Sequence, residues 1–185
     1  MTELPLQFLM GLGGSSSDRR QDMPTTITGT DGVSQVQNGA VESGDLPAGS
    51  VIQVVSSQGS DRLQTTSSTY SDIPGFNLTI TPTSASSSIL VTFSCHTYVR
   101  DGSDWEAAEF KLLRDDQEIL VGGSYGFANK GEQQMSYQTN HFLDNPSTTS
   151  TLTYKLQGAR TRGSDLIDFN FFGMPGSITA MEIAG

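Results

Sequence analysis

From Val51 onward the sequence is a series of short segments in which apolar residues recur at every second position, and this periodicity constrains the fold more than any other feature. Within 89–99, Val91, Phe93 and Cys95 alternate with hydroxyl-bearing residues, and 151–157 alternates in the same way. A side-chain period of two is that of a β-strand with one buried and one solvated face. The pattern therefore predicts an all-β protein.

Nine segments have this character, and most are rich in β-branched and aromatic residues. We expect strands at 51–55, 76–80, 89–99, 105–113, 118–122, 134–143, 151–157, 166–172 and 178–183. The connectors between them carry Pro, Gly, Asp, Asn and Ser, which initiate turns. The segment 105–114 also has the composition of a helix, but it is too short for this to outweigh the strand pattern.

Strands that are short and evenly spaced favour a sandwich or barrel over a helical alternation. We predict one antiparallel β-sandwich from about Val51 to Ile183. Its core is expected to contain Val91, Phe93, Leu112, Leu152, Tyr154, Leu156, Phe169 and Ile178.

Residues 1 to about 48 show no sustained periodicity and are interrupted by glycines, including the run GLGGSSS at 11–17. We interpret them as an extended N-terminal arm, with a docking peptide and hinge at 1–24 and a linker at 25–50 before the head at 51–185. The apolar side chains expected to dock on a partner protein are Leu4, Leu6, Phe8, Leu9, Met10 and Leu12. A floppy terminus, or a segment that folds back against the chain's own head, remains open as an alternative.

The net charge of -10 argues against nucleic acid and against anionic lipid surfaces as partners. Nucleic-acid binding needs a basic surface that neutralises phosphates, and this chain has 20 acidic and 10 basic residues. The longest apolar runs are a few residues long, far below the roughly 20 needed to span a bilayer. Ser and Thr together number 44, so the expected surface is hydroxylic rather than ionic.

The sequence contains no recognisable catalytic or metal-binding motif. Cys95 is the only cysteine, so no intrachain disulfide or Cys-based zinc site can form, and its place in an apolar stripe predicts a core residue. His96 and His141 lack a second ligand at metal spacing. The glycine run at 11–17 lacks the Lys-Ser/Thr ending of a phosphate loop. We expect no enzymatic activity, no cofactor and no metal.

Two pairs of aspartates could in principle bind calcium or act as paired catalytic carboxylates. Asp115 and Asp116 lie between two apolar runs, which predicts a hairpin turn. Asp101 and Asp104 lack the repeated Asp pattern of a calcium loop, and a solvated connector is the favoured interpretation.

The order of several segments resembles a known group of proteins. The stretches 25–55, 67–93, 110–119, 142–157 and 177–185 look like successive landmarks of short tail-fibre and other virion structural proteins of bacteriophages, particularly those of marine bacteria. The resemblance implies a homotrimeric virion appendage on the outer surface of the particle, at the tail or the capsid. It also implies a head similar to the jelly roll of tumour necrosis factor.

Two functions follow from this resemblance. The first is a short tail fibre, anchored by its arm to other virion proteins, whose head adheres to a glycan or protein of the host surface. The alternative is a capsid decoration protein, of the cement or head-fibre type, without receptor-binding activity. Phe171 and Phe172 are the residues expected at the trimer interface, since apolar positions on both faces of a strand imply burial on both sides.

Overall fold

The computed structural model describes residues 43–59, 61–99, 106–124, 133–171 and 176–185. The chain divides into two compact units, Met1–Asn38 and Gly39–Gly185, and every described residue belongs to the second. The arm residues expected to dock, from Leu4 to Leu12, lie outside the described residues.

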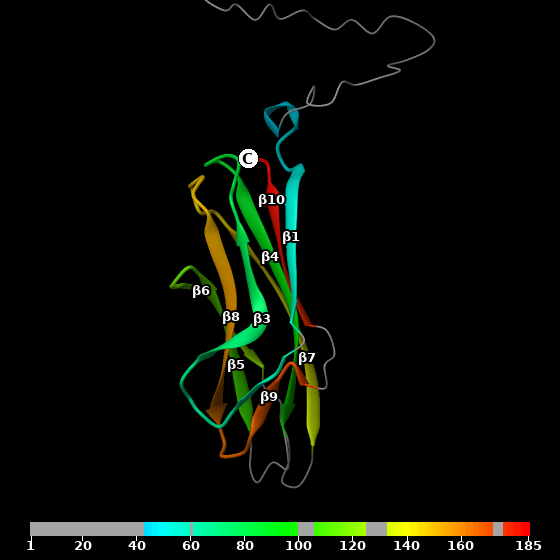
Figure 1. Ribbon diagram of the computed structural model, residues 1–185, viewed down its shortest axis with the longest axis vertical. Coiled ribbons are helices and arrows are strands. Elements are labelled where there is room, and N and C mark those ends of the chain that lie inside the picture. Colours follow the sequence, from blue (N-terminus) through cyan, green and yellow to red (C-terminus); the bar gives the residue numbers. More distant parts are fainter. Residues whose placement is uncertain (1–42, 60, 100–105, 125–132, 172–175) are drawn as a thin grey trace, which may run out of the picture. The chain divides into compact units, whose positions relative to one another are not determined.

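The described part is an antiparallel β-sandwich, preceded by one short 3-10 helix, η1 (Ser43–Asp45). The first sheet contains β1 (Val51–Gly59), β10 (Gly176–Ile183), β4 (Ser88–Val99) and β7 (Gln134–Asp144), with the short strands β9 (Ile167–Phe169) and β2 (Leu63–Thr65) continuing it beside β4. The second sheet contains β3 (Ser71–Ile80), β8 (Leu152–Arg162), β5 (Ala107–Arg114) and β6 (Gln117–Ser124). Figure 1 shows the two layers.

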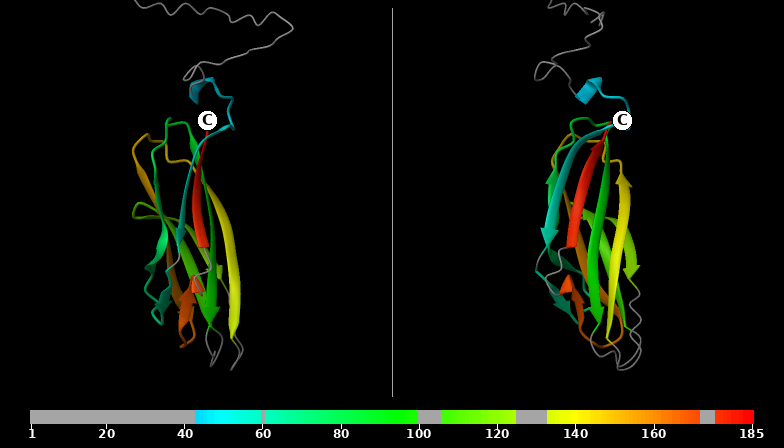
Figure 2. Two further views of the ribbon diagram at one scale, coloured as in Figure 1. Left: turned by 45° about the vertical axis from the view of Figure 1, so that its right-hand side comes forward. Right: turned by 90° about the vertical axis from the view of Figure 1, so that its right-hand side faces the viewer.

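The strand order confirms the predicted jelly-roll-like fold. With the short strands set aside, the orders are β1-β10-β4-β7 and β3-β8-β5-β6, so most neighbours are far apart in the sequence. Eight antiparallel strands in two sheets joined by such crossovers form a jelly roll. The right-hand view of Figure 2 looks onto the outer side of the first sheet, with its four long strands side by side.

The core lies between the sheets and is built from the inward positions of both. All eight residues predicted for it are buried, and Cys95 is buried with them. Phe110 of the second sheet meets Phe169 of the first edge-to-face, with ring centroids 5.1 Å apart. The Phe169 ring also fills the space over Gly158, where a Cβ would come within 2.7 Å of it. Glycine is therefore required there for the two layers to approach.

The strand segments are confirmed, while several boundaries differ from the prediction. The segment with helical composition forms the strand β5. Arg114 and Gln117 flank the predicted two-residue hairpin turn, in which Asp115 has a φ of 54°. Strand β2 and helix η1 were not predicted, because three residues are too few to show a periodicity.

The expected strand at 166–172 is shorter than predicted, because β9 ends at Phe169. Asn170 has a φ of 57°, and its buried amide donates hydrogen bonds to the carbonyl oxygens of Gly59 at 2.7 Å and Asp61 at 3.1 Å. The backbone therefore leaves the sheet at Asn170. Across the described ranges, no helix is long and apolar enough to span a bilayer.

Candidate interaction surface

The outward side chains of the four long strands of the first sheet form a continuous surface without a single Asp, Glu, Lys or Arg. We call this surface the charge-free face. Its residues are Val51, Val54, Ser56 and Gln58 of β1; Ser177, Thr179, Met181 and Ile183 of β10; Ser88, Leu90, Thr92, Ser94, His96 and Tyr98 of β4; and Met135, Tyr137, Thr139, His141 and Leu143 of β7.

The strand register arranges these side chains in rows across the sheet. Val54, Met181, Leu90 and Leu143 are opposite one another on successive strands and form an apolar row. The next two rows carry mainly Ser and Thr, and within them the Ser56 and Thr179 hydroxyls are hydrogen-bonded at 2.9 Å. Apolar side chains and hydroxyl groups therefore alternate in bands over the face.

Large apolar side chains are exposed mainly here. Six are exposed among the described residues, and all except Val121 belong to the charge-free face. Tyr137 is 61% exposed, Val54 55% and Leu143 53%. Contiguous exposed apolar surface of this kind marks interaction sites more often than single exposed apolar residues do.

The outer face of the second sheet has the opposite character. Lys111 pairs with Glu118 at 2.5 Å, and its amine lies 4.1 Å from the centre of the Tyr70 ring. Gln157 donates a 2.6 Å hydrogen bond to Asp72. Charged side chains and their partners are typical of a solvated surface. The two outer faces therefore differ in kind, although each covers one side of the same core.

Aromatic side chains gather toward the β9 end of the charge-free face. His96 lies opposite Tyr137, with the ring centroids 3.9 Å apart in an edge-on arrangement. Tyr98 stacks on Phe171 with the rings 4.2 Å apart and nearly parallel. On the same side of the short strand β9, opposite Tyr98, lies Asp168, which is fully buried.

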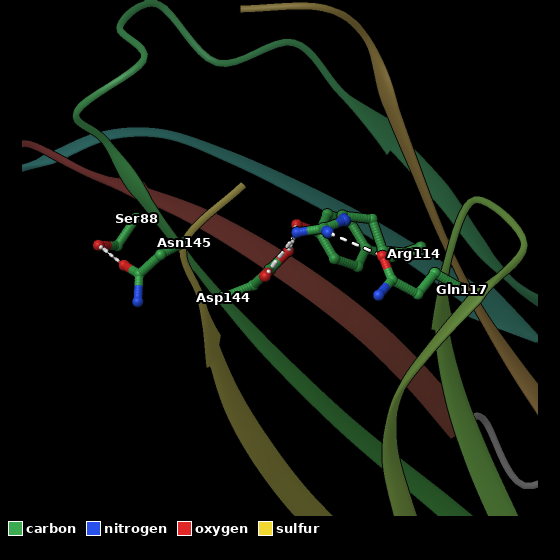
Figure 3. Close-up of polar contacts among 6 residues, drawn as sticks. Ser88, Arg114, Gln117, Asp144 and Asn145 are labelled. Atoms are coloured by element: carbon green, nitrogen blue, oxygen red, sulfur yellow. Dashed lines mark hydrogen bonds and ion pairs between the residues drawn. The ribbon is translucent and has the colours of Figure 1, made fainter. Parts of the chain in front are cut away.

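A buried polar cluster holds the end of β7, which is one of the two edge strands of this face. Arg114 of β5 donates two hydrogen bonds to the Asp144 carboxylate, at 2.8 and 2.9 Å, and one to Gln117 at 3.2 Å. The Tyr154 hydroxyl of β8 donates to the same carboxylate at 2.6 Å. Figure 3 shows Arg114 and Asp144 directed toward each other, and the separate bond between Ser88 and Asn145 nearby.

The cluster joins the two sheets, because Asp144 ends β7 while Arg114 and Tyr154 belong to the second sheet. Burial raises the pKa of Tyr154, and the hydrogen bond to Asp144 and the charge of that carboxylate raise it further. Tyr154 therefore stays neutral and remains a hydrogen-bond donor. A charge-assisted bidentate pair of this geometry constrains direction as well as distance.

The structure describes one of the two residues predicted for the trimer interface. Phe171 is buried against its own chain, where it supports the Tyr98 ring, and Phe172 lies outside the described residues. Contact of this pair with a second subunit stays a prediction. The charge-free face itself was not identified from the sequence, although its signal was present: outward positions of 89–99 and 134–143 lack charge.

The described residues hold no group of three or more His, Cys, Asp or Glu side chains placed to bind a metal ion. Asp101 and Asp104 lie outside those residues. Cys95 is buried, and burial raises the pKa of its thiol to about 12. A thiol in this state is a poor nucleophile and a poor ligand.

Comparisons with known proteins give one family and several distant structures. The family model described as Bc2l-C, N-terminal domain, matches residues 60–178. No curated protein matches the chain. The structure of Eiger TNF from S. frugiperda aligns at 9% identity and a TM-score of 0.43, covering 71% of this chain and 93% of that one.

A crystal structure of the infectious bursal disease virus VP2 subviral particle aligns at 14% identity and a TM-score of 0.37. The alignment covers 72% of this chain and 37% of that chain, so this chain spans little more than a third of the VP2 length.

Proposed function

The chain belongs to the Bc2l-C N-terminal domain family, and we propose that it forms the homotrimeric β-sandwich head of a bacteriophage virion appendage. The observation that carries the subunit association is the charge-free face. A chain with a net charge of -10 that keeps 19 outward positions of four strands free of ionic side chains has a surface suited to burial against protein.

Burial of exposed apolar side chains stabilises the association of subunits. Tyr137, Leu143 and Val54 are each more than half exposed in the single chain. Full burial of a large apolar side chain contributes about 1.5–3 kcal/mol before the entropic cost of association is subtracted. Several such residues on one face contribute favourably to a subunit contact, and the hydroxyl bands offer hydrogen-bonding groups around them.

Three subunits, and the virion as the location, are supported by the resemblance to phage short tail-fibre proteins over residues 25–185. In this arrangement the first sheets face one another and the charged outer faces of the second sheets stay in solvent. The head adheres to a glycan or protein of the host surface, the arm attaches to other virion proteins, and no catalytic step is involved.

Sedimentation velocity of the full chain tests the association. We expect a species of three times 19.8 kDa at micromolar concentration. Thr139→Asp places a charge in the charge-free face, whereas Thr79→Asp places the same charge at an exposed position near the end of β3 in the second sheet. The first variant should dissociate and the second should stay trimeric, with unchanged circular dichroism in both. A monomeric parent chain, or equal behaviour of the two variants, would contradict the proposed interface.

Imaging of purified phage particles tests the location. Antibody against the head should label a protrusion at the tail. Label distributed over the capsid would instead favour the decoration protein, and absence of the chain from purified particles would exclude both.

A further inference from the structure

Both histidines of this chain project onto the charge-free face. His96 lies on β4 opposite Tyr137, and His141 lies on the adjacent strand β7 opposite Thr92. Histidine is the side chain whose charge ordinarily changes between pH 5 and 8. The only groups on the four long strands of this face that can become positively charged near neutral pH are therefore these two imidazoles.

The two histidines differ in exposure. His96 is 2% exposed in the single chain, and neither of its ring nitrogens has a hydrogen-bond partner. His141 is exposed, and it would lose solvent only when a second subunit covers the face. Linkage between protonation and association requires a group whose surroundings change on association. His141 meets this requirement, whereas His96 is already buried before assembly.

Among the described residues, the outward positions around His141 carry no compensating charge. Its outward neighbours on β7 are Thr139 and Leu143, and Thr92 faces it from β4. Farther along that row lie Thr179 of β10 and Ser56 of β1, which are also uncharged. An imidazolium buried among these groups would be unpaired, and an unpaired buried charge is strongly unfavourable.

His96 has aromatic neighbours on the same face. Tyr137 faces its ring from β7, Tyr98 follows on β4, and Asn170 donates its backbone N–H to the His96 carbonyl oxygen. Asp168 of β9 is the nearest acidic position by register and has interactions of its own. Burial lowers the pKa of His96, which favours its neutral form.

We propose that subunit association through the charge-free face is controlled by protons, with His141 as the group that senses pH. The proposal rests on the proposed trimer. With the imidazole neutral, the face is uncharged and the subunits associate. A protonated imidazole would give each subunit a positive charge at His141 that association would have to bury. Association is therefore expected to be stronger at pH 7.5 than at pH 5.0, because histidine is the side chain whose charge ordinarily changes within this range.

The experiment is sedimentation velocity of the full chain at pH 7.5 and 5.0. We expect the apparent dissociation constant of the parent chain to rise at least about tenfold at pH 5.0. A tenfold rise corresponds to about 1.4 kcal/mol of association free energy. His141→Gln, which is neutral at both values, should remain trimeric at both. His141→Lys should be dissociated already at pH 7.5, while Thr79→Lys on the second sheet should not. Circular dichroism confirms that the subunits stay folded.

The outcomes separate this inference from the proposed function. A parent chain that is monomeric at pH 7.5 refutes the trimer itself. A trimer of equal strength at both pH values leaves the trimer in place and refutes proton control. A His141→Gln variant that still dissociates at pH 5.0 refutes the assignment to His141.

Discussion

Tyr154, on β8 of the second sheet, donates a 2.6 Å hydrogen bond to Asp144, at the end of β7 in the first sheet. Arg114, on β5, donates two further hydrogen bonds to the same carboxylate. Among the described strands β7 pairs only with β4, so one of its edges has no ladder partner. The Tyr154–Asp144–Arg114 cluster is thus what ties the end of this strand to the opposite layer.

The first prediction concerns that cluster. Asp144→Ala leaves the Arg114 guanidinium and the Tyr154 hydroxyl without their shared acceptor, and loss of one partner of a buried pair costs about 3–5 kcal/mol. Because the Arg114 side chain is 21% exposed and water can partly replace the carboxylate, we expect about 2–3 kcal/mol. Urea unfolding at pH 7 measures the loss.

The matched control is Asn145→Ala, one residue farther along. Asn145 is exposed and accepts one hydrogen bond from Ser88. The change in unfolding free energy should stay within about 0.5 kcal/mol. Equal losses in the two variants would show that the cluster does not hold β7.

The second prediction concerns acid stability. Burial by itself raises the pKa of Glu182, but hydrogen bonds from Gln53 and Thr83 outweigh it and leave the pKa below its ordinary value. A lowered pKa means that the stabilisation is present above about pH 4.5, where the unfolded chain titrates, and is lost as the pH falls through the folded value. Glu182→Gln should lower the stability at pH 7 by about 1–3 kcal/mol.

The variant should also show a flatter loss of stability between pH 5 and 3 than the parent chain, as measured by urea midpoints at each pH. Glu118→Gln serves as the comparison, because Glu118 is 44% exposed and pairs with Lys111 at the surface. A parent-like acid profile in Glu182→Gln would contradict the assignment.

The third prediction concerns the single thiol. Cys95 is buried, and its pKa is raised to about 12, so almost no thiolate forms at pH 8. The folded protein should not react with Ellman's reagent over an hour at pH 8, and one thiol per chain should react after denaturation. Rapid reaction of the native protein would mean that the sheets open readily around β4.

The fourth prediction concerns the turn after β8. Gly163 has a φ of 87°, and a Cβ there would come within 2.0 Å of the Glu106 carboxylate. That carboxylate accepts backbone N–H groups of Ser164 at 2.8 Å and Asp165 at 3.2 Å. Gly163→Ala should therefore destabilise the protein by about 1–3 kcal/mol. Gly44→Ala, which meets nothing within 4 Å, should be close to neutral in the same thermal unfolding experiment.

The fold was predictable because the alternation is strong where each strand is covered on one side. Val91, Phe93 and Tyr154 could be assigned to the core from their own segments, since the period of two depends on local residues alone. The pairing of β1 with β10 and of β3 with β8 joins residues far apart in the sequence, so periodicity does not predict the strand order, and the jelly-roll expectation came from the resemblance.

The buried polar residues were not predictable. Glu182 is stabilised by Gln53, 129 positions away, and Asp144 by Arg114, 30 positions away. A single sequence gives no sign that such partners meet. The charge-free face could not be predicted for the same reason. Each strand reveals only its own outward residues, and their common lack of charge becomes informative once the register places the strands side by side.

The pairing of β1 with β10 has a mechanical consequence. The chain enters the sandwich at Ser50, which accepts a hydrogen bond from the Ala184 N–H, and β1 then runs antiparallel to β10 through eight paired positions. A pull transmitted along residues 43–50, against a head held at its far end, acts parallel to β1 and loads this ladder in shear. The hydrogen bonds must then break together rather than in succession, so the unfolding rate under tension should stay low and a tether attached here can withstand force.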